Sequence, residues 1–198
     1  MVRTPLPLLV YNRLDTLQKV WEAIRLAQPK YLFISGDGPK ESKESQEAVA
    51  AVRRFCETSI DWPCEAHFQW LPTNHGHKQG VLKGIFWFFA QVSEGIVLED
   101  DTLPIPDFFP FCEALLEKYR DEPRVGMISG FNGISSRYIP YQHDFIRLPL
   151  MGGLGELAPH LGGVRPRHER LGPPTQNRLF SAHHEGQPTP QNVPANLL

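Results

Sequence analysis

Short apolar segments alternate with segments of helical periodicity through residues 1–146 of this 198-residue chain. Parallel strands need a crossover connection, which is usually a helix, so this alternation is typical of α/β folds with a mainly parallel sheet. The sequence therefore predicts an α/β domain. The predicted strands are 6–11, 31–35, 65–71, 95–98 and 125–129.

Four helices are expected between these strands. Asp15 and Ser42 are the predicted N-caps of the first two, because short polar side chains accept hydrogen bonds from the free N–H groups of a helix start. The third helix is expected after Gly80, and the fourth opens at Asp107. The apolar residues that share one face of the first two helices are Leu17, Val20, Trp21, Ile24, Val49, Val52 and Phe55.

Charge and composition name no macromolecular partner. The formal net charge is −2 and the pI is about 6.4, so no basic surface for nucleic acid is expected. The apolar runs are too short for an integral membrane segment, and the N-terminus lacks a signal-peptide pattern, which predicts a cytoplasmic protein. The three cysteines are expected to be reduced core thiols, because they lack metal-ligand spacing.

The composition changes near residue 147. Residues 147–198 contain eight Pro, seven Gly, a single aromatic residue and no Lys, whereas residues 1–146 hold the other 20 aromatic residues. We therefore predict one domain over residues 1–146, followed by a Pro/Gly-rich, irregular tail over residues 147–198.

Polar residues follow three of the predicted strands. Asn12 and Arg13 follow the first, a Gly-Asp-Gly-Pro turn at 36–39 follows the second, and Glu99-Asp100-Asp101 follows the fourth. Open α/β sheets bind ligands outside the carboxyl ends of their strands, so these residues are candidates for a site. The first two groups also have a simpler explanation as a link to a helix and as an ordinary turn.

The acidic triplet points to a cation more strongly. It directly follows the apolar run 95–98, which is typical of a strand buried on both faces, so at least one carboxylate must point back over the sheet edge. Mn²⁺ and Mg²⁺ prefer oxygen ligands and are often held by one or two carboxylates plus the phosphates of a substrate. We therefore predict a divalent cation here, with a plain acidic turn as the alternative.

Four motifs resemble, in order, those of GT-A glycosyltransferases: LVYNRLDTLQKVWEAI, YLFISGDGP, HGHKQGVLKGIFWFF and EGIVLEDDTLPIPDFF. More narrowly, the motifs resemble those of bacterial nucleotide-diphospho-sugar transferases, a few of which carry a haemolysin-like label. The last motif is also similar to the Glu-Asp-Asp segment of animal N-acetylglucosaminyltransferases. The resemblance covers roughly residues 5–135. It implies a Rossmann-like GT-A fold with helices on both sheet faces, a nucleoside diphosphate sugar donor, and Mn²⁺ or Mg²⁺ as cofactor.

The resemblance also implies roles for the acidic residues. Asp101 would be the direct metal ligand, and Asp100 would face the donor sugar or a metal-bound water. Glu99 would reach the ribose hydroxyls of the donor. Asp37, after the second predicted strand, would lie at the base or the ribose.

The remaining donor-site residues implied by the resemblance come from two loops. The backbone of Tyr11, Asn12 and Arg13 would line the base pocket. Lys78 matches a basic position near the diphosphate, at an expected helix start where backbone amides also favour anions.

Three further residues are weaker candidates for this site. His75 and His77 flank that position and depart from the usual family pattern, so a surface loop is the alternative for them. Asn132 is a further candidate for shaping the donor site.

The implied reaction is transfer of the sugar to a hydroxyl of a glycan, lipid or protein acceptor, with the metal as a Lewis acid. The family places its acceptor residues in a WGWA.W stretch beyond the fifth strand, and residues 147–198 contain no tryptophan, so no catalytic base is assigned. Our hypothesis is a reading-frame slip between about residues 132 and 150, because a shifted frame can restore such a stretch at 151–162. A native irregular tail is the alternative.

Two other functions stay open at this point. A chain that lacks the acceptor half could be inactive and serve as a non-catalytic nucleotide-binding remnant. A metal-dependent phosphohydrolase that uses Asp100 or Asp101 is the other, although only Asp37 provides a further carboxylate after another strand.

Overall fold

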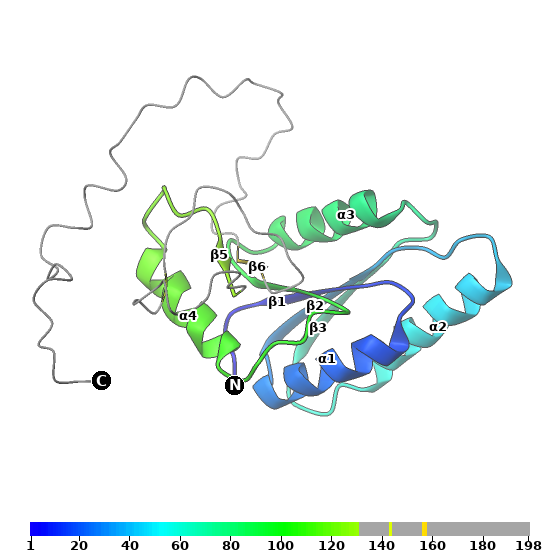
Figure 1. The fold of residues 1–198 in the computed structure, drawn as a ribbon, viewed down its shortest axis with the longest axis horizontal. Helices are drawn as coiled ribbons and strands as arrows, with labels where there is room; N and C mark the ends of the chain where they lie inside the picture. The colour runs from blue at the N-terminus through cyan, green and yellow to red at the C-terminus, as the bar shows by residue number, and fades with distance from the viewer. Residues whose placement is uncertain (131–142, 144–155, 158–198) are drawn as a thin grey trace, which may run out of the picture. The chain divides into compact units, whose positions relative to one another are not determined.

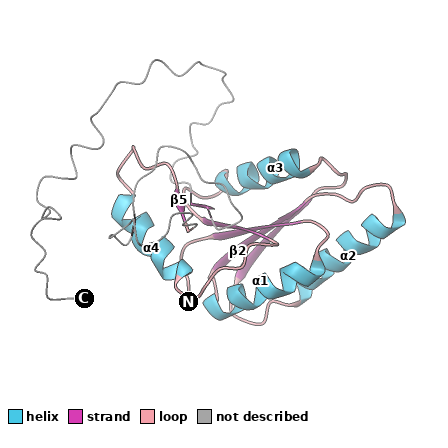
Figure 2. Ribbon diagram, viewed as in Figure 1, coloured by secondary structure: helices cyan, strands magenta, loops and turns pink. Residues whose placement is uncertain are grey.

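The computed structural model describes residues 1–130, His143 and residues 156–157, all within the first of its two structural units, Met1–Gly163. Helices and strands alternate in chain order through most of this part (Figures 1 and 2). The described elements are β1 (Leu6–Val10), α1 (Leu14–Ala27), β2 (Tyr31–Gly36), α2 (Lys43–Thr58), β3 (Glu65–Trp70), α3 (His77–Phe89), β4 (Ile96–Glu99), α4 (Phe108–Tyr119), β5 (Ile128–Ser129) and β6 (Glu156–Leu157).

The strands form one sheet in the order β3-β2-β1-β4-β6-β5. The first four of these strands are parallel neighbours, whereas β6 pairs antiparallel with both β4 and β5. The predicted α/β fold with a mainly parallel sheet is therefore confirmed, and it is compatible with a Rossmann-like arrangement.

Side chains of the parallel strands alternate between the two faces of the sheet. Leu8 and Ile34 belong to the core cluster that also holds the buried residues of α1 and α4. Leu9 and Ser35 point to the other face, where α3 crosses them at Gly84: a Cβ on this glycine would lie 2.7 Å from Leu9 Cδ2. Figure 1 shows α3 on the opposite side of the sheet from α1 and α2, so helices cover both faces.

Helix α2 begins as the sequence predicts, and α1 does not. The Oγ of Ser42 accepts a hydrogen bond from the N–H of Ser45 at 3.3 Å, which confirms Ser42 as an N-cap. The prediction of Asp15 as an N-cap is wrong, because Arg13 holds that position and Asp15 lies in the first turn. There its negative charge still favours the positive end of the helix dipole.

Two other boundaries differ from the prediction. Helix α3 begins at His77, before Gly80, because Gly76 adopts a left-handed φ of 77° that turns the chain into the helix. The strand expected over 125–129 is reduced to Ile128–Ser129, the pair that bonds to β6. The earlier start of α3 places His77 and Lys78 in its first turn.

Strand β6 lies in the segment for which an irregular tail is predicted. Its residues pair with the middle of the sheet, Leu157 opposite Ile96 and Glu156 opposite Val97. A two-residue strand has too few side chains to produce an alternating pattern, so the sequence offers no signal for it. The rest of the predicted tail lies outside the described residues.

All three cysteines are free, as predicted, and burial raises the pKa of Cys56 and Cys112 to about 12, so both stay protonated at neutral pH.

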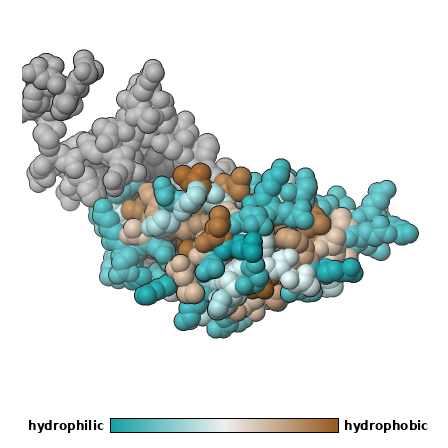
Figure 3. Space-filling model, turned by 90° about the horizontal axis from the view of Figure 1, so that it is seen from below, coloured by the Kyte–Doolittle hydropathy of each residue, from teal (hydrophilic) through white to brown (hydrophobic). Residues whose placement is uncertain are grey.

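In the part of the chain that the structure describes, no helix is both long and apolar enough to cross a membrane. Figure 3 shows apolar patches separated by hydrophilic side chains on the face seen from below.

Gly95, at the turn into β4, allows the close approach of α3 to the sheet. The fully buried ring of Phe88 would lie 2.2 Å from a Cβ on this residue, and the carbonyl oxygen of Pro5 would lie 2.9 Å from it. We predict that Gly95→Ala lowers the free energy of unfolding by about 1–3 kcal/mol in urea denaturation, because the packed ring and the backbone must move. Gly126→Ala is the control, because no atom lies within 4 Å of its added methyl group; equal stability of both variants would contradict the prediction.

Candidate functional site

The strand order reverses between β1 and β4. The chain runs outward from β1 through β2 to β3 and then places β4 on the other side of β1. Open α/β sheets bind ligands at the carboxyl ends of the strands that flank such a reversal. The segment Tyr11-Asn12-Arg13 follows β1 and the triplet Glu99-Asp100-Asp101 ends β4, so the fold brings these two predicted groups to the same point.

Asp100 ties the ends of these two strands together. Its Oδ2 accepts a hydrogen bond from the N–H of Tyr11 at 2.9 Å, and the residue is only 6% exposed. The hydroxyl of Tyr11 in turn lies 3.3 Å from the Oγ of Ser45 on α2. Asp100 therefore holds the backbone at the end of β1 in place.

Asp101 points outward and pairs with the loop after β1. Its Oδ2 lies 3.0 Å from Nη2 of Arg13, and the two side chains are 37% and 57% exposed. An ion pair this exposed contributes at most about 1 kcal/mol, so it can open readily. Asn12, between the two contacts, is half-buried, and its side chain makes no hydrogen bond to a described residue.

The carboxyls at the end of β4 are destabilised in their charged forms. Burial raises the pKa of Glu99, and the negative charge of Asp101 raises it further. Burial also raises the pKa of Asp100, although the hydrogen bond from Tyr11 and the positive charge of Arg13 oppose the change. Acids with pKa values raised by burial and by a neighbouring charge are typical of functional sites, where a bound cation relieves the cost.

The start of α3 carries basic side chains. A positive charge on His77 would lower the pKa of Glu99 and so oppose the effect of burial. Lys78 is exposed and forms no ion pair with a described residue. The first backbone N–H groups of a helix lack partners within it, so this end of α3 favours an anion.

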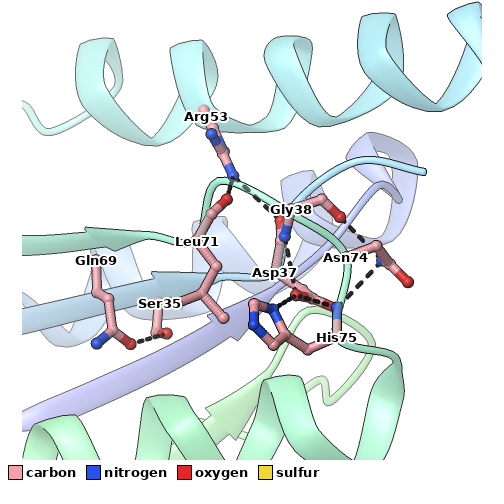
Figure 4. Close-up of polar contacts among 8 residues, drawn as sticks. All are labelled: Ser35, Asp37, Gly38, Arg53, Gln69, Leu71, Asn74 and His75. Atoms are coloured by element: carbon pink, nitrogen blue, oxygen red, sulfur yellow. Dashed lines mark hydrogen bonds and ion pairs between the residues drawn. The ribbon is translucent and has the colours of Figure 1, made fainter. Parts of the chain in front are cut away.

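Asp37 follows β2 and is enclosed by its neighbours. Its carboxylate accepts hydrogen bonds from the backbone and side chains of the segment 74–75 (Figure 4). Its side chain is 10% exposed. The predicted contact between Asp37 and a base or ribose stays a prediction.

The predicted ligand contacts of His75 and His77 stay predictions. The structure places the ring of His75 beside the carboxylate of Asp37. Asn132, the remaining candidate, lies outside the described residues.

The described residues contain no group of three or more His, Cys, Asp or Glu side chains arranged to hold a metal ion. A site that combines one or two carboxylates with the phosphates of a substrate has fewer protein ligands than such a group. Asp101 is the most accessible oxygen donor of the triplet, because Asp100 points inward and Glu99 is half-buried. The residues present therefore fit a metal that is shared with a phosphate ligand.

Comparison of the chain with models of protein families and with curated proteins finds no match. The fold class and the geometry of this edge are therefore the observations that bear on function.

The raised pKa of Glu99 has a testable consequence for stability. An acid whose pKa is higher in the folded state stabilises the fold below its unfolded pKa and loses that contribution as the pH rises through the folded value. We predict that Glu99→Gln is more stable than the wild type at pH 8 in metal-free buffer. The advantage should shrink as the pH falls through the raised pKa, measured by urea denaturation at several pH values.

Asp61→Asn is the matched control, with the opposite sign. The side-chain hydrogen bond from Arg25 lowers the pKa of Asp61, so this carboxylate stabilises the fold above its unfolded pKa and loses that effect as the pH falls through the folded value. Asp61→Asn should therefore be less stable than the wild type at pH 8. The same pH trend in both variants would contradict the assignment of Glu99.

Proposed function

We propose that this chain has a GT-A-type donor-binding domain that holds a nucleoside diphosphate sugar and Mn²⁺ or Mg²⁺ where β1 and β4 end. The proposed activity is transfer of the sugar to an acceptor hydroxyl. One observation supports it most: three adjacent acids, two of them with pKa values raised by burial, lie at the strand reversal of a parallel sheet. An acidic turn in free solvent would give neither the burial nor this position.

The three acids suit different tasks in this proposal. Asp101 is the accessible carboxylate and would hold the cation. Asp100 is buried against Tyr11, so its main effect would be to fix the strand end from which the donor is bound. Glu99 is half-buried and would accept hydrogen bonds from the ribose hydroxyls.

Positive groups beside the acids would bind the diphosphate. Lys78 is exposed in the first turn of α3, and the free N–H groups of that turn point out of the start of the helix. Arg13 would become available once a cation takes its place at Asp101. When bound, the metal supplies charge neutralisation on the departing diphosphate.

A non-catalytic nucleotide-binding module is the second candidate. The absence of tryptophan from residues 147–198 favours it, because the family's acceptor residues lie in a tryptophan-rich stretch. In this case donor and metal would bind without turnover. Transfer or hydrolysis of a nucleotide-sugar by the full chain would exclude this candidate.

Ligand-dependent stability tests the proposed site. We predict that one member of a panel of UDP, ADP, GDP and CDP raises the melting temperature by about 5–10 °C at a hundredfold excess over its Kd, and only with Mn²⁺ present. Asp101→Asn should abolish the shift, because the cation loses its ligand. Thermal unfolding of the full chain with each nucleotide, with and without Mn²⁺, provides the measurement.

Asp107→Asn is the matched control for this experiment. Asp107 lies six residues further along the same loop, at the start of α4, and its side chain makes no capping hydrogen bond. This variant should keep the full shift. A nucleotide-dependent shift that survives in Asp101→Asn would show that the acidic triplet is not the metal site.

The Arg13–Asp101 ion pair leads to a second prediction, for the metal alone. Because the guanidinium and a cation compete for the same carboxylate, Arg13→Gln should bind Mn²⁺ about two- to fivefold more tightly in the absence of nucleotide. The measurement is a titration of free Mn²⁺ by electron paramagnetic resonance. Arg25→Gln removes the same charge from the similarly exposed pair with Asp61 and should leave the affinity unchanged.

A further inference from the structure

The carboxylate of Asp37 has little capacity left for a ligand. Oδ1 accepts hydrogen bonds from the N–H groups of Gly38 (2.9 Å) and His75 (3.0 Å) and lies 3.3 Å from the ring Nδ1 of His75. Oδ2 accepts from Nδ2 of Asn74 at 3.2 Å and shares the N–H of His75 at 3.1 Å. An ionised carboxylate has about four lone-pair positions, so these contacts engage nearly all of them.

The surroundings of Asp37 are equally closed. Arg53 of α2 donates from Nη2 to the carbonyl oxygens of Asp37 (3.2 Å) and Leu71 (2.7 Å), which ties the ends of β2 and β3 together (Figure 4). On the side of α3, a Cβ on Gly80 would lie 3.0 Å from Cγ of Asp37. Asp37 therefore sits among three elements rather than at an open edge.

Gly38 shows how tightly the two loops meet beside this carboxylate. A Cβ on Gly38 would lie 2.2 Å from the backbone carbonyl carbon of Thr73. The carbonyl oxygen of Gly38 also accepts a hydrogen bond from Nδ2 of Asn74 at 2.9 Å. The loop after β2 and the loop before α3 thus form one unit that Asp37 holds together.

His75 is a group of this unit that keeps a free polar atom on its ring. Its side chain is 29% exposed, and its Nε2 has no hydrogen-bond partner among the described residues. A carboxylate that accepts from Nδ1 favours the ring form with its proton there, which leaves Nε2 as an acceptor. The orientation of the ring is fixed in the same way that carboxylates orient histidines at other sites.

We infer that Asp37 is a positioning residue and that His75 contacts the nucleoside part of the donor. The inference rests on the proposed function and changes the residue that the family resemblance assigns to the base or ribose. The ligand group that suits Nε2 of His75 is a hydrogen-bond donor, such as an imide N–H of a base or a ribose hydroxyl. Asp37 acts on the nucleoside only through the ring and the backbone that it holds.

Two probes separate a contact with the nucleoside from a contact with the phosphates. The first is the nucleoside diphosphate that gives the largest thermal shift, and the second is pyrophosphate, which has no nucleoside; both are titrated by calorimetry with Mn²⁺. His75→Ala should lower the affinity for the nucleotide about five- to thirtyfold, because one hydrogen bond to the nucleoside is lost. The affinity for pyrophosphate should stay unchanged.

Asp37→Asn tests the positioning role. The new amide group would face N–H donors, so we expect the melting temperature without ligand to fall by about 4–10 °C. The affinity for the nucleotide should fall more than the affinity for pyrophosphate. General destabilisation alone would not change the ratio of these two affinities. If this variant does not fold, the His75→Ala titration still decides the inference.

His67→Ala is the matched control. His67 lies on β3, its ring Nε2 is 3.0 Å from the carboxylate of Glu65, and its side chain is 36% exposed, so the control removes a similar histidine–carboxylate pair. It should leave both affinities unchanged.

Three outcomes would overturn the inference. In the first, His75→Ala binds the nucleotide as tightly as the wild type. In the second, Asp37→Asn keeps its melting temperature and loses the nucleotide, which would make Asp37 the direct ligand. In both of these outcomes the proposed function would still hold if pyrophosphate binds and its binding depends on Asp101. In the third, the wild type binds neither probe, and the proposed function is overturned as well.

Discussion

The burial of acids at the end of β4 is the constraint on which the candidate site depends. Glu99 and Asp100 pay a desolvation cost because the parallel sheet carries β4 into the interior between two helical layers. The protein offsets part of that cost with groups already present: the N–H of Tyr11 at Asp100 and the guanidinium of Arg13 at Asp101. Neither group can neutralise three carboxylates. The remaining imbalance is the basis for proposing a cation at this edge, and a cation held by so few ligands would need an anionic partner such as a phosphate.

Two polar connections organise the same edge in different ways. Asp100 joins the ends of β1 and β4 with one buried hydrogen bond, while Asp37 joins the turn after β2 to the loop before α3 with several. Both are aspartates that follow parallel strands, and both are nearly enclosed. Because the backbone N–H groups that they accept from would otherwise be left without partners, each carboxylate determines where a loop lies. Asp101, by contrast, is exposed and restrains only a flexible arginine. Two aspartates thus fix the positions of loops, and a third can exchange its partner. Such different roles are expected in a binding site.

The sequence predicts the fold class and the strand ends that the fold brings together at the candidate site, but not the partner of each side chain. Alternating apolar and helical segments were sufficient for the parallel sheet and for the cap at Ser42, because these depend on local patterns. Parallel topology then brought Tyr11 and Glu99 to one edge. The contacts of Asp37 could not be predicted, since they come from residues 37 or 38 positions away that meet only after folding. The same holds for the Arg13–Asp101 pair, which spans the two sides of the strand reversal. Strand β6 was missed because it is held by backbone pairing, which two residues can form without any characteristic side chains.

The position of β6 bears on how the proposed donor site and the rest of the chain are connected. It pairs with Ile96 and Val97, one residue before the acidic triplet begins, and so covers the side of β4 that faces away from β1. A parallel sheet with β4 at its edge would expose the backbone of that strand beside the site, which is unfavourable and open to pairing with other chains. Covering this edge needs only main-chain hydrogen bonds, so it places few demands on the sequence after residue 147. An acceptor site, in contrast, needs particular side chains at particular places. The edge proposed to bind the donor can therefore form without particular side chains after residue 147, and for this reason binding and turnover have to be measured separately.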